Sequence, residues 1–272
     1  MNVQRISNEM IVRTAAKGNQ EKWYDMHTDS WYKLDQLGYE ALAEVVISQL
    51  LEESNIESDT PFTFVRYNMG AFCVRGLERI GCVSKNFLKQ GQSIITLNRL
   101  LTQYLGYPVR EKLSRLSSNK KRIAYLAEAT AGHTGLEQFP EYLTLLFEID
   151  ALFSNNDRHL NNIAVLEQNG KFDYCPIFDN GAGLLSNIHS YPMDIEPKAL
   201  ISALRARPFS TTFTRQRNTA RSLYGSYLTV PQCSSALLRS RLEPLLEYYP
   251  KQDRYWIADR VITCILKRQK RI

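Results

Sequence analysis

Residues 155–181, with the sequence NNDRHLNNIAVLEQNGKFDYCPIFDNG, constrain the fold of this chain more than any other segment. They contain two largely apolar runs, 162–166 and 172–178, separated by a polar stretch with an Asn-Gly pair. Such a pair between two apolar runs is typical of a tight β-hairpin turn. We therefore expect two antiparallel strands, which would bring Asn162 and Asp179 together at the open end of the hairpin.

Three polar residues of this stretch have the spacing of a phosphoryl-transfer site. Asp157 lies in a short loop, Asn162 follows five residues later, and Asp179 lies in a turn after the second strand. A carboxylate can orient an acceptor hydroxyl, while an amide oxygen and a second carboxylate suit Mg²⁺. Polar residues also cluster in ordinary turns. The hairpin, the second Asp and the apolar segment 142–153 favour the chemical interpretation: Asp157 is catalytic, and Asn162 and Asp179 are metal ligands.

The run Asp157, Arg158, His159 and Asn162 resembles two groups of kinases. It is similar to the HipA-like protein kinases of bacteria and to the DRHxxN signature of phosphatidylinositol 3- and 4-kinases. Standard protein kinases have HRDxxxxN followed by DFG, whereas here His follows Asp and the later turn is FDNG. The resemblance implies an α+β, bilobal protein-kinase-like fold that uses ATP and Mg²⁺. For His159 we expect a structural role, hydrogen-bonding the loop backbone near Asp179.

Such a site also needs a lysine for the nucleotide phosphates and an acid that holds the lysine. Lys33 lies at the end of a predicted strand, in the run WYKLD. Downstream, residues 39–53 are predicted to form an amphipathic helix with Glu40 and Glu44 one turn apart on one face. Either acid could reach Lys33. Kinase-like folds take this partner from within the helix, so by similarity we favour Glu44.

The loop that would cover the phosphates has a weaker signal. The segment AAKGNQEK contains a single glycine, Gly18, and the chain has no GxGxxG motif. Gly18 and Asn19 could form a tight turn whose N–H groups face phosphate, with charge added by Lys17 or Lys22. On its own, Lys17 is expected to be a solvated turn residue. HipA-like enzymes often lack the glycine-rich consensus, so its absence does not contradict the resemblance, and we assign Gly18 to nucleotide binding from this possible turn.

The chain is expected to form two lobes: a small β-rich nucleotide-binding lobe, residues 1–84, and a larger, mainly helical catalytic lobe, residues 85–272. A length of 272 residues with 44% hydrophobic residues suffices for two packed lobes and a cleft. Residues 83–87 are the candidate hinge, whose backbone would hydrogen-bond adenine. The predicted strands of the first lobe are 22–25, 30–34, 63–69, 71–77 and 81–87, and the predicted late helices are 196–207, 236–248 and 253–270.

Composition bears on location and partners. The five cysteines have no metal-ligand spacing, and neither a signal peptide nor a membrane span is evident, so we expect a cytoplasmic protein without membrane contact. The net charge of +6 is concentrated late in the chain. Clustered cations attract nucleic acid, but a solvated basic face is the favoured interpretation because no known nucleic-acid-binding motif accompanies them. These cations include Arg205, Arg207, Arg215, Arg217 and Arg221, and the nearby Ser210, Thr211, Thr212 and Thr214 are candidate autophosphorylation sites.

The function implied by the resemblance is that of a HipA-like serine/threonine protein kinase, which transfers the γ-phosphoryl group of ATP to a protein hydroxyl. Toxin members of the family phosphorylate translation components such as an aminoacyl-tRNA synthetase and have antitoxin partners. We expect this sequence to lack the extra N-terminal subdomain of HipA, so the resemblance supports the kinase core more than it supports partner binding or regulation. Two alternatives remain: a small-molecule or lipid kinase of kinase-like fold, and a non-catalytic pseudokinase that binds a partner.

Overall fold

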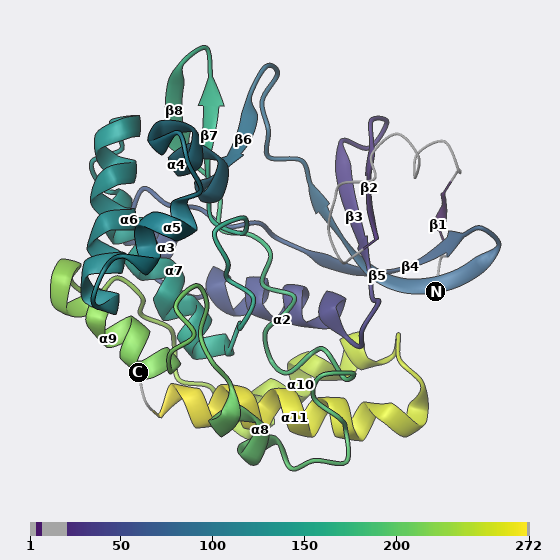
Figure 1. Cartoon of the computed structure of the whole chain (residues 1–272). Coiled ribbons are helices and arrows are strands. Elements are labelled where there is room, and N and C mark those ends of the chain that lie inside the picture. The colour runs from purple at the N-terminus through teal and green to yellow at the C-terminus, as the bar shows by residue number, and fades with distance from the viewer. Residues whose placement is uncertain (1–3, 7–20, 271–272) are drawn as a thin grey trace.

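The computed structural model describes residues 4–6 and 21–270. A five-stranded sheet lies on one side of the molecule, and most of the helices gather on the other (Figure 1). Only the pairing of the first strand with its neighbour is parallel. In spatial order the strands are β1 (Gln4–Ile6), β4 (Asn68–Val74), β5 (Leu77–Lys85), β3 (Ser30–Leu34) and β2 (Lys22–Asp25).

The centre of this sheet is the hairpin of β4 and β5. Its two turn residues, Arg75 and Gly76, both have positive φ angles, 51° and 79°, as a two-residue hairpin of matching twist requires. The β3 strand pairs with β5, so that Lys33 lies opposite Cys82. The proposed boundary between the lobes, at residue 84, lies at the end of β5 and stays a prediction.

The expected strand at 63–69 is only partly correct. The β4 strand begins at Asn68, and residues 63–67 form an extended segment that contacts a different part of the chain. Val65 donates its backbone N–H to Ile177 (2.9 Å), and Ile177 donates to Thr63 (2.8 Å). This bridge fastens the chain before the sheet to the segment that precedes Asp179.

A second sheet contains the hairpin expected from the sequence. The β7 strand (Ala164–Gln168) and the β8 strand (Lys171–Tyr174) are antiparallel, and the turn residues Asn169 and Gly170 have φ angles of 53° and 77°. This prediction is confirmed. The sequence did not indicate a third strand, β6 (Ser93–Thr96), which pairs along the outer edge of β7.

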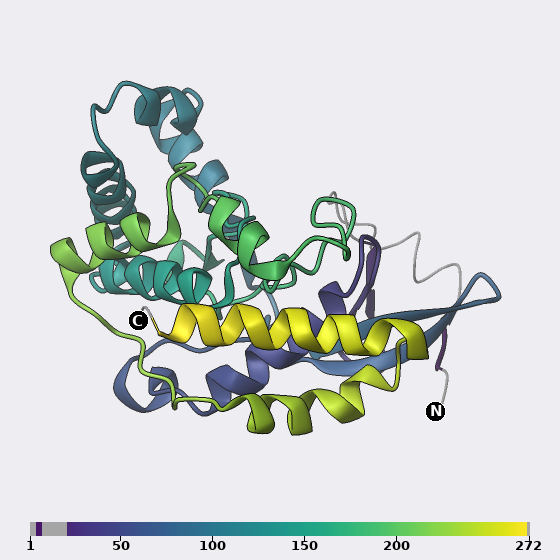
Figure 2. The same ribbon diagram turned by 90° about the horizontal axis from the view of Figure 1, so that it is seen from below.

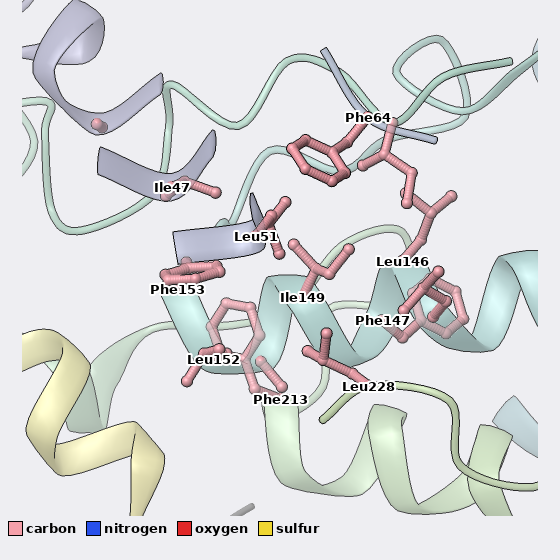
Figure 3. Close-up of a cluster of buried hydrophobic side chains, with 14 of the residues drawn as sticks. Ile47, Leu51, Phe64, Leu146, Phe147, Ile149, Leu152, Phe153, Phe213 and Leu228 are labelled. Carbon is pink, nitrogen blue, oxygen red and sulfur yellow. The ribbon is translucent and has the colours of Figure 1, made fainter. Parts of the chain in front are cut away.

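The main hydrophobic core surrounds helix α7 (Phe139–Phe153). This helix is apolar on nearly all sides, as expected of a buried helix, and Figure 3 shows Leu146, Ile149 and Phe153 within the core. The opposite wall comes from helix α2 (Glu40–Glu52), which contributes Ile47 and Leu51. The same α2 also packs against β5 of the first sheet, so one helix fixes the sheet to the helical part.

The remaining helices cover the core. Three helices expected late in the chain are present with shifted ends, because a Pro or Ser at or before the first turn sets each start. Helix α9, which begins among the candidate autophosphorylation sites, was not predicted. None of the helices in the described ranges is long and apolar enough to cross a membrane. These helices are α3 (Ile56–Asp59), α4 (Leu97–Leu105), α5 (Val109–Ser114), α6 (Asn119–Thr134), α8 (Pro197–Ala203), α9 (Phe213–Tyr224), α10 (Ser235–Leu246) and α11 (Lys251–Gln269).

Candidate active site

A cleft of about 770 Å³ is lined by three of the candidate residues, Asp157, Asn162 and Asp179. It lies where β2 and the start of α2 face the loop before β7 and the turn after β8. Its walls carry both cations and carboxylates, and its floor is formed partly by Phe178. The charged and amide residues at its surface include Lys22, Asp157, Asn162, Asp179 and Arg207.

Lys33 extends from β3 toward the cleft and is held by two carboxylates. Its Nζ lies 2.6 Å from Glu44 Oε1 and 3.0 Å from Asp179 Oδ1, and 5.1 Å from the centre of the Tyr67 ring. Burial alone would lower the pKa of Lys33, but the Asp179 and Glu44 carboxylates raise it well above its ordinary value. Lys33 is therefore a fixed positive charge.

Glu44 joins the lysine to the turn that follows the hairpin. Its side chain is 0% exposed, and its second oxygen, Oε2, accepts the backbone N–H of Asn180 at 2.9 Å. The other candidate acid, Glu40, instead accepts the backbone N–H groups of Leu37 (2.8 Å) and Gln36 (3.4 Å). Of the two acids on this face of α2, the structure brings Glu44 to Lys33 and uses Glu40 to order the entrance of the helix.

Asp179 lies in a turn with an unusual backbone conformation. Its φ angle is 62°, in the left-handed region that residues other than glycine rarely adopt. Burial would raise the pKa of its carboxyl, but Lys33, with help from Lys22, lowers this pKa to about 2. The side chain is 30% exposed toward the cleft. A constrained, ionised carboxylate beside a fixed lysine is suited to binding a cation and phosphate together.

The loop from 155 to 162 presents Asp157 at the mouth of the cleft. The Asp157 side chain is 56% exposed, and partial burial raises its pKa, against the effect of His159 and in the same direction as Asp179. Asn162 Nδ2 donates to the Asp157 carbonyl (2.9 Å), which orients the amide within the loop. The expected bond from His159 to the backbone near Asp179 is absent from the described residues. The His159 Nε2 lies 3.8 Å from Asp157 Oδ2, and the buried His159 Nδ1 has no hydrogen-bond partner in the part of the chain that the structure describes.

Arg158 takes the structural role that the sequence suggested for His159. Its guanidinium, 1% exposed, forms a buried ion pair with Asp150 of α7, with Nη2 at 3.1 Å from Oδ1. It also donates to the carbonyls of Asn162 (3.1 Å) and Phe178 (2.8 Å) and to Asn180 Oδ1 (2.6 Å). One side chain therefore connects α7, the loop and the turn at Asp179.

Sequence reasoning missed this role, although a signal existed. Glu148 and Asp150 are two acids in an otherwise apolar run, and a buried acid needs a partner. Asp150 receives Arg158, which still leaves its pKa raised to about 6 because burial outweighs the ion pair. The charge of Arg158 is retained inside the core by this arrangement.

Two elements expected from the sequence, the phosphate-covering loop and the hinge, stay predictions. Gly18, Asn19 and Lys17 lie outside the described residues, so the assignment of Gly18 to nucleotide binding stays a prediction. Lys22 is described and lines the cleft, across β2 and β3 from Lys33. The proposed hinge at 83–87 ends with Phe87, whose ring lies 6.3 Å from that of Phe178.

The donor set of the cleft suits a magnesium–nucleotide complex better than a metal ion held by protein alone. No group of three or more His, Cys, Asp or Glu side chains converges in the part of the chain that the structure describes. Mg²⁺ typically takes only one or two protein ligands and completes its shell with water and phosphate oxygens. Asp179 and Asn162 line the same cleft and offer a carboxylate and an amide. These residues fit such a shared site.

Comparison with proteins of known structure identifies the fold of this chain. No protein-family model matches the chain, and no curated protein matches it in sequence. The Helicobacter pylori proinflammatory kinase CtkA aligns over 94% of this chain and 89% of its own, with a TM-score of 0.61 and 13% identity. HipA of Shewanella oneidensis MR-1, solved with HipB and operator DNA, aligns over 100% of this chain and 66% of its own, with a TM-score of 0.51 and 14% identity. The chain has the α+β fold of HipA-like kinases, as the sequence resemblance predicted.

Proposed function

We propose that the protein is an ATP-dependent phosphotransferase that acts on a serine or threonine hydroxyl of another protein. The observation that carries this proposal is the convergence of Lys33, Glu44 and Asp179 within hydrogen-bond distance, with Asp157 on the same cleft. These residues come from four separate segments of the chain. Their arrangement supplies a phosphate-binding cation, its buried partner, a metal-binding carboxylate and an exposed carboxylate for the acceptor.

In the proposed mechanism each residue has a distinct task. Lys33, fixed by Glu44, neutralises the nucleotide phosphates. Asn162 and Asp179 would hold Mg²⁺, which supplies further charge neutralisation when bound. Asp157 orients the acceptor hydroxyl and accepts its proton late in the transfer. Because the transition state is largely dissociative, positioning and electrostatics should determine most of the rate.

A protein acceptor is favoured over a small one by the position of Asp157. Its carboxylate is more than half exposed at the mouth of the cleft, where a hydroxyl on a large partner can approach it. Use of ATP also favours a cytoplasmic location. The HipA of the comparison was solved with HipB, and by this likeness we propose an antitoxin-type partner. A pull-down with the protein from its own cells tests that partner directly.

The deciding experiment is incubation of the purified protein with γ-labelled ATP and Mg²⁺, alone and with a cell extract. Asp157→Ala and Asp179→Ala serve as controls, and mass spectrometry identifies labelled residues. We expect label on serine or threonine of protein, lost in both variants. Label on lipid or on a small molecule alone would instead identify the alternative kinase class. Nucleotide binding without any transfer would identify a pseudokinase.

A further inference from the structure

Helices α4, α5 and the first turns of α6 carry an unusual concentration of positive charge. Between residues 97 and 125 there are seven Lys or Arg residues and a single acid, Glu111. The cations are Arg99, Arg110, Lys112, Arg115, Lys120, Lys121 and Arg122, and all but Lys112 and Arg122 are exposed. Within the described parts of the chain, none of the seven forms an ion pair with a carboxylate. We call this region the α4–α6 surface.

Two of the five late arginines that the sequence suggested as a basic face serve the fold, as do two arginines further along the chain, whereas Arg205, Arg207 and Arg215 are exposed. Arg217 and Arg260 are buried, and Arg260 donates to the carbonyls of Tyr191 and Pro192. Arg221 binds the buried Glu148, and Arg241 pairs with Glu53. Much of the late positive charge therefore stabilises the fold. On the α4–α6 surface, Arg122 donates to the Leu113 carbonyl and to Asn119, and the five exposed cations keep their charge available to a partner.

Aromatic rings are interleaved with the cations of the α4–α6 surface. The Lys112 ammonium lies 5.4 Å from the centre of the Tyr125 ring, and the Arg115 guanidinium lies 5.7 Å from that of Tyr107. Tyr104 is 59% exposed, and its ring centre lies 4.7 Å from that of His133, with the two ring planes tilted by 52°. An exposed aromatic ring beside cations that form no ion pair with a described carboxylate is a surface on which a base can stack.

The Tyr125 hydroxyl is an unsatisfied polar group in the same region. This oxygen is buried and has no hydrogen-bond partner among the described residues. Buried hydroxyls are normally satisfied, because leaving one unpaired costs free energy. Its neighbours are Tyr107 and Tyr104, which also raise its pKa after the effect of burial.

We propose that the α4–α6 surface binds single-stranded nucleic acid. Phosphates would contact the exposed lysines and arginines, and a base would stack on Tyr104, a combination that single-strand binders use. An acidic protein or an anionic membrane would use the charges but would not require a stacking face. Figure 2 shows α4 and α5 at the outer edge of the molecule, apart from α10 and α11, where an extended strand has access.

The surface begins beside the proposed active site. Thr96 lines the cleft, and its hydroxyl accepts the backbone N–H of Arg99 at the start of α4. A nucleic acid on this surface would therefore bring a protein bound to it close to Asp157. The binding itself does not depend on phosphoryl transfer, so it is tested without ATP.

The test measures binding of a fluorescein-labelled oligouridine and an oligothymidine of about 16 nucleotides, the upper end of typical site sizes. Anisotropy is followed from about 50 to 200 mM salt, over which we expect affinity to fall about tenfold or more. Lys120→Gln/Lys121→Gln should reduce the salt slope by about 1 to 2. Tyr104→Ala should weaken binding about fivefold or more with the slope unchanged, and Tyr104→Phe should restore it.

The matched control is Lys198→Gln/Lys251→Gln, which removes two exposed cations outside the α4–α6 surface. It should bind as the unmodified protein does, and circular dichroism verifies that every variant is folded. An equal loss of affinity in this control would overturn the proposal, since the attraction between the protein and the oligonucleotide would then not depend on the α4–α6 surface. Three further results would overturn the proposal. They are unchanged affinity in Tyr104→Ala, displacement of the labelled oligonucleotide by heparin but not by unlabelled oligonucleotide, and tighter binding of the protein to phosphatidylserine vesicles than to oligonucleotide. Preference between the two oligonucleotides identifies RNA or DNA as the ligand.

Discussion

Asn180 donates its backbone N–H to Glu44 Oε2 at 2.9 Å, although 136 residues separate the two in sequence. The other oxygen of the same carboxylate receives Lys33. One buried side chain of α2 therefore positions both Lys33, the proposed phosphate-binding lysine, and the turn that carries Asp179. If α2 moved, the lysine and the turn would lose their common support.

Glu44→Gln tests this shared support. A glutamine offers one acceptor oxygen and no charge, so it cannot hold Lys33 and Asn180 equally. We expect phosphoryl transfer to fall by about 10²-fold or more and the free energy of unfolding to fall by about 1–3 kcal/mol. Kinetics and urea denaturation measure the two effects. Glu40→Gln is the matched control on the same helix face, and equal rates for both variants would contradict the assignment.

Arg158→Met should destabilise the protein severely. The substitution leaves Asp150 buried without its cation, a loss worth about 3–5 kcal/mol in comparable buried pairs. The double variant Arg158→Met/Asp150→Leu should recover part of that stability, because no unpaired charge remains. A double-mutant cycle in urea measures the coupling. Additive effects of the single changes would show that the pair is not coupled.

Asp157→Ala should abolish transfer while leaving the fold intact. The side chain is largely exposed, so we expect stability to change by about 0.5 kcal/mol or less. The rate should fall by about 10²–10⁴-fold, as for loss of other catalytic acids and bases. Nucleotide affinity, measured by calorimetry, should stay within a few fold. A parallel loss of nucleotide binding would give Asp157 a different role.

Asp35 should make stability depend on pH. Burial raises the pKa of its carboxyl to about 7, although Tyr249 and the backbone of Ala41 donate to it at 2.6 Å. The folded state therefore holds this proton more tightly than the unfolded state, and stability falls as the pH rises from about 4 to 7. A full shift of that size corresponds to about 4 kcal/mol. Because Asp35 is only partly buried, we expect the loss of unfolding free energy over this pH range to be about 1–2 kcal/mol.

Asp35→Asn provides the measurement for this effect. The amide keeps the shape and hydrogen-bonding capacity of the neutral acid but does not titrate. Its melting temperature, relative to that of the unmodified protein, should therefore rise between pH 5 and pH 8. A constant difference between the two proteins over this range would show that Asp35 does not titrate there.

The sequence predicted local structure well where turns and periodicity are explicit. The hairpin turn at Asn169 and the helix that carries Glu44 follow from residue patterns alone. The kinase-like fold was predicted from a resemblance confined to a short run around Asp157. The lobe boundary and the chemical roles of Asp157, Asn162 and Asp179 stay predictions.

Other features depend on contacts between distant segments, which local patterns do not encode. The choice of Glu44 over Glu40 requires knowing that the Glu40 carboxylate already accepts the backbone N–H of Leu37. The role of Arg158 depends on Asp150 lying on a neighbouring buried helix. Likewise, the net charge did not reveal that Arg217 is buried and that Arg221 binds the buried Glu148, whereas Arg205, Arg207 and Arg215 are exposed.

Helix α7 carries two buried acids that bind different partners. Asp150 receives Arg158, whereas Glu148 accepts the backbone N–H groups of Tyr227 (3.0 Å) and Leu228 (2.8 Å) as well as Arg221. The rest of the helix fills the core. In a library of random variants selected for a folded protein, α7 should therefore tolerate the fewest substitutions, and even Glu148→Gln or Asp150→Asn should be rare among the survivors.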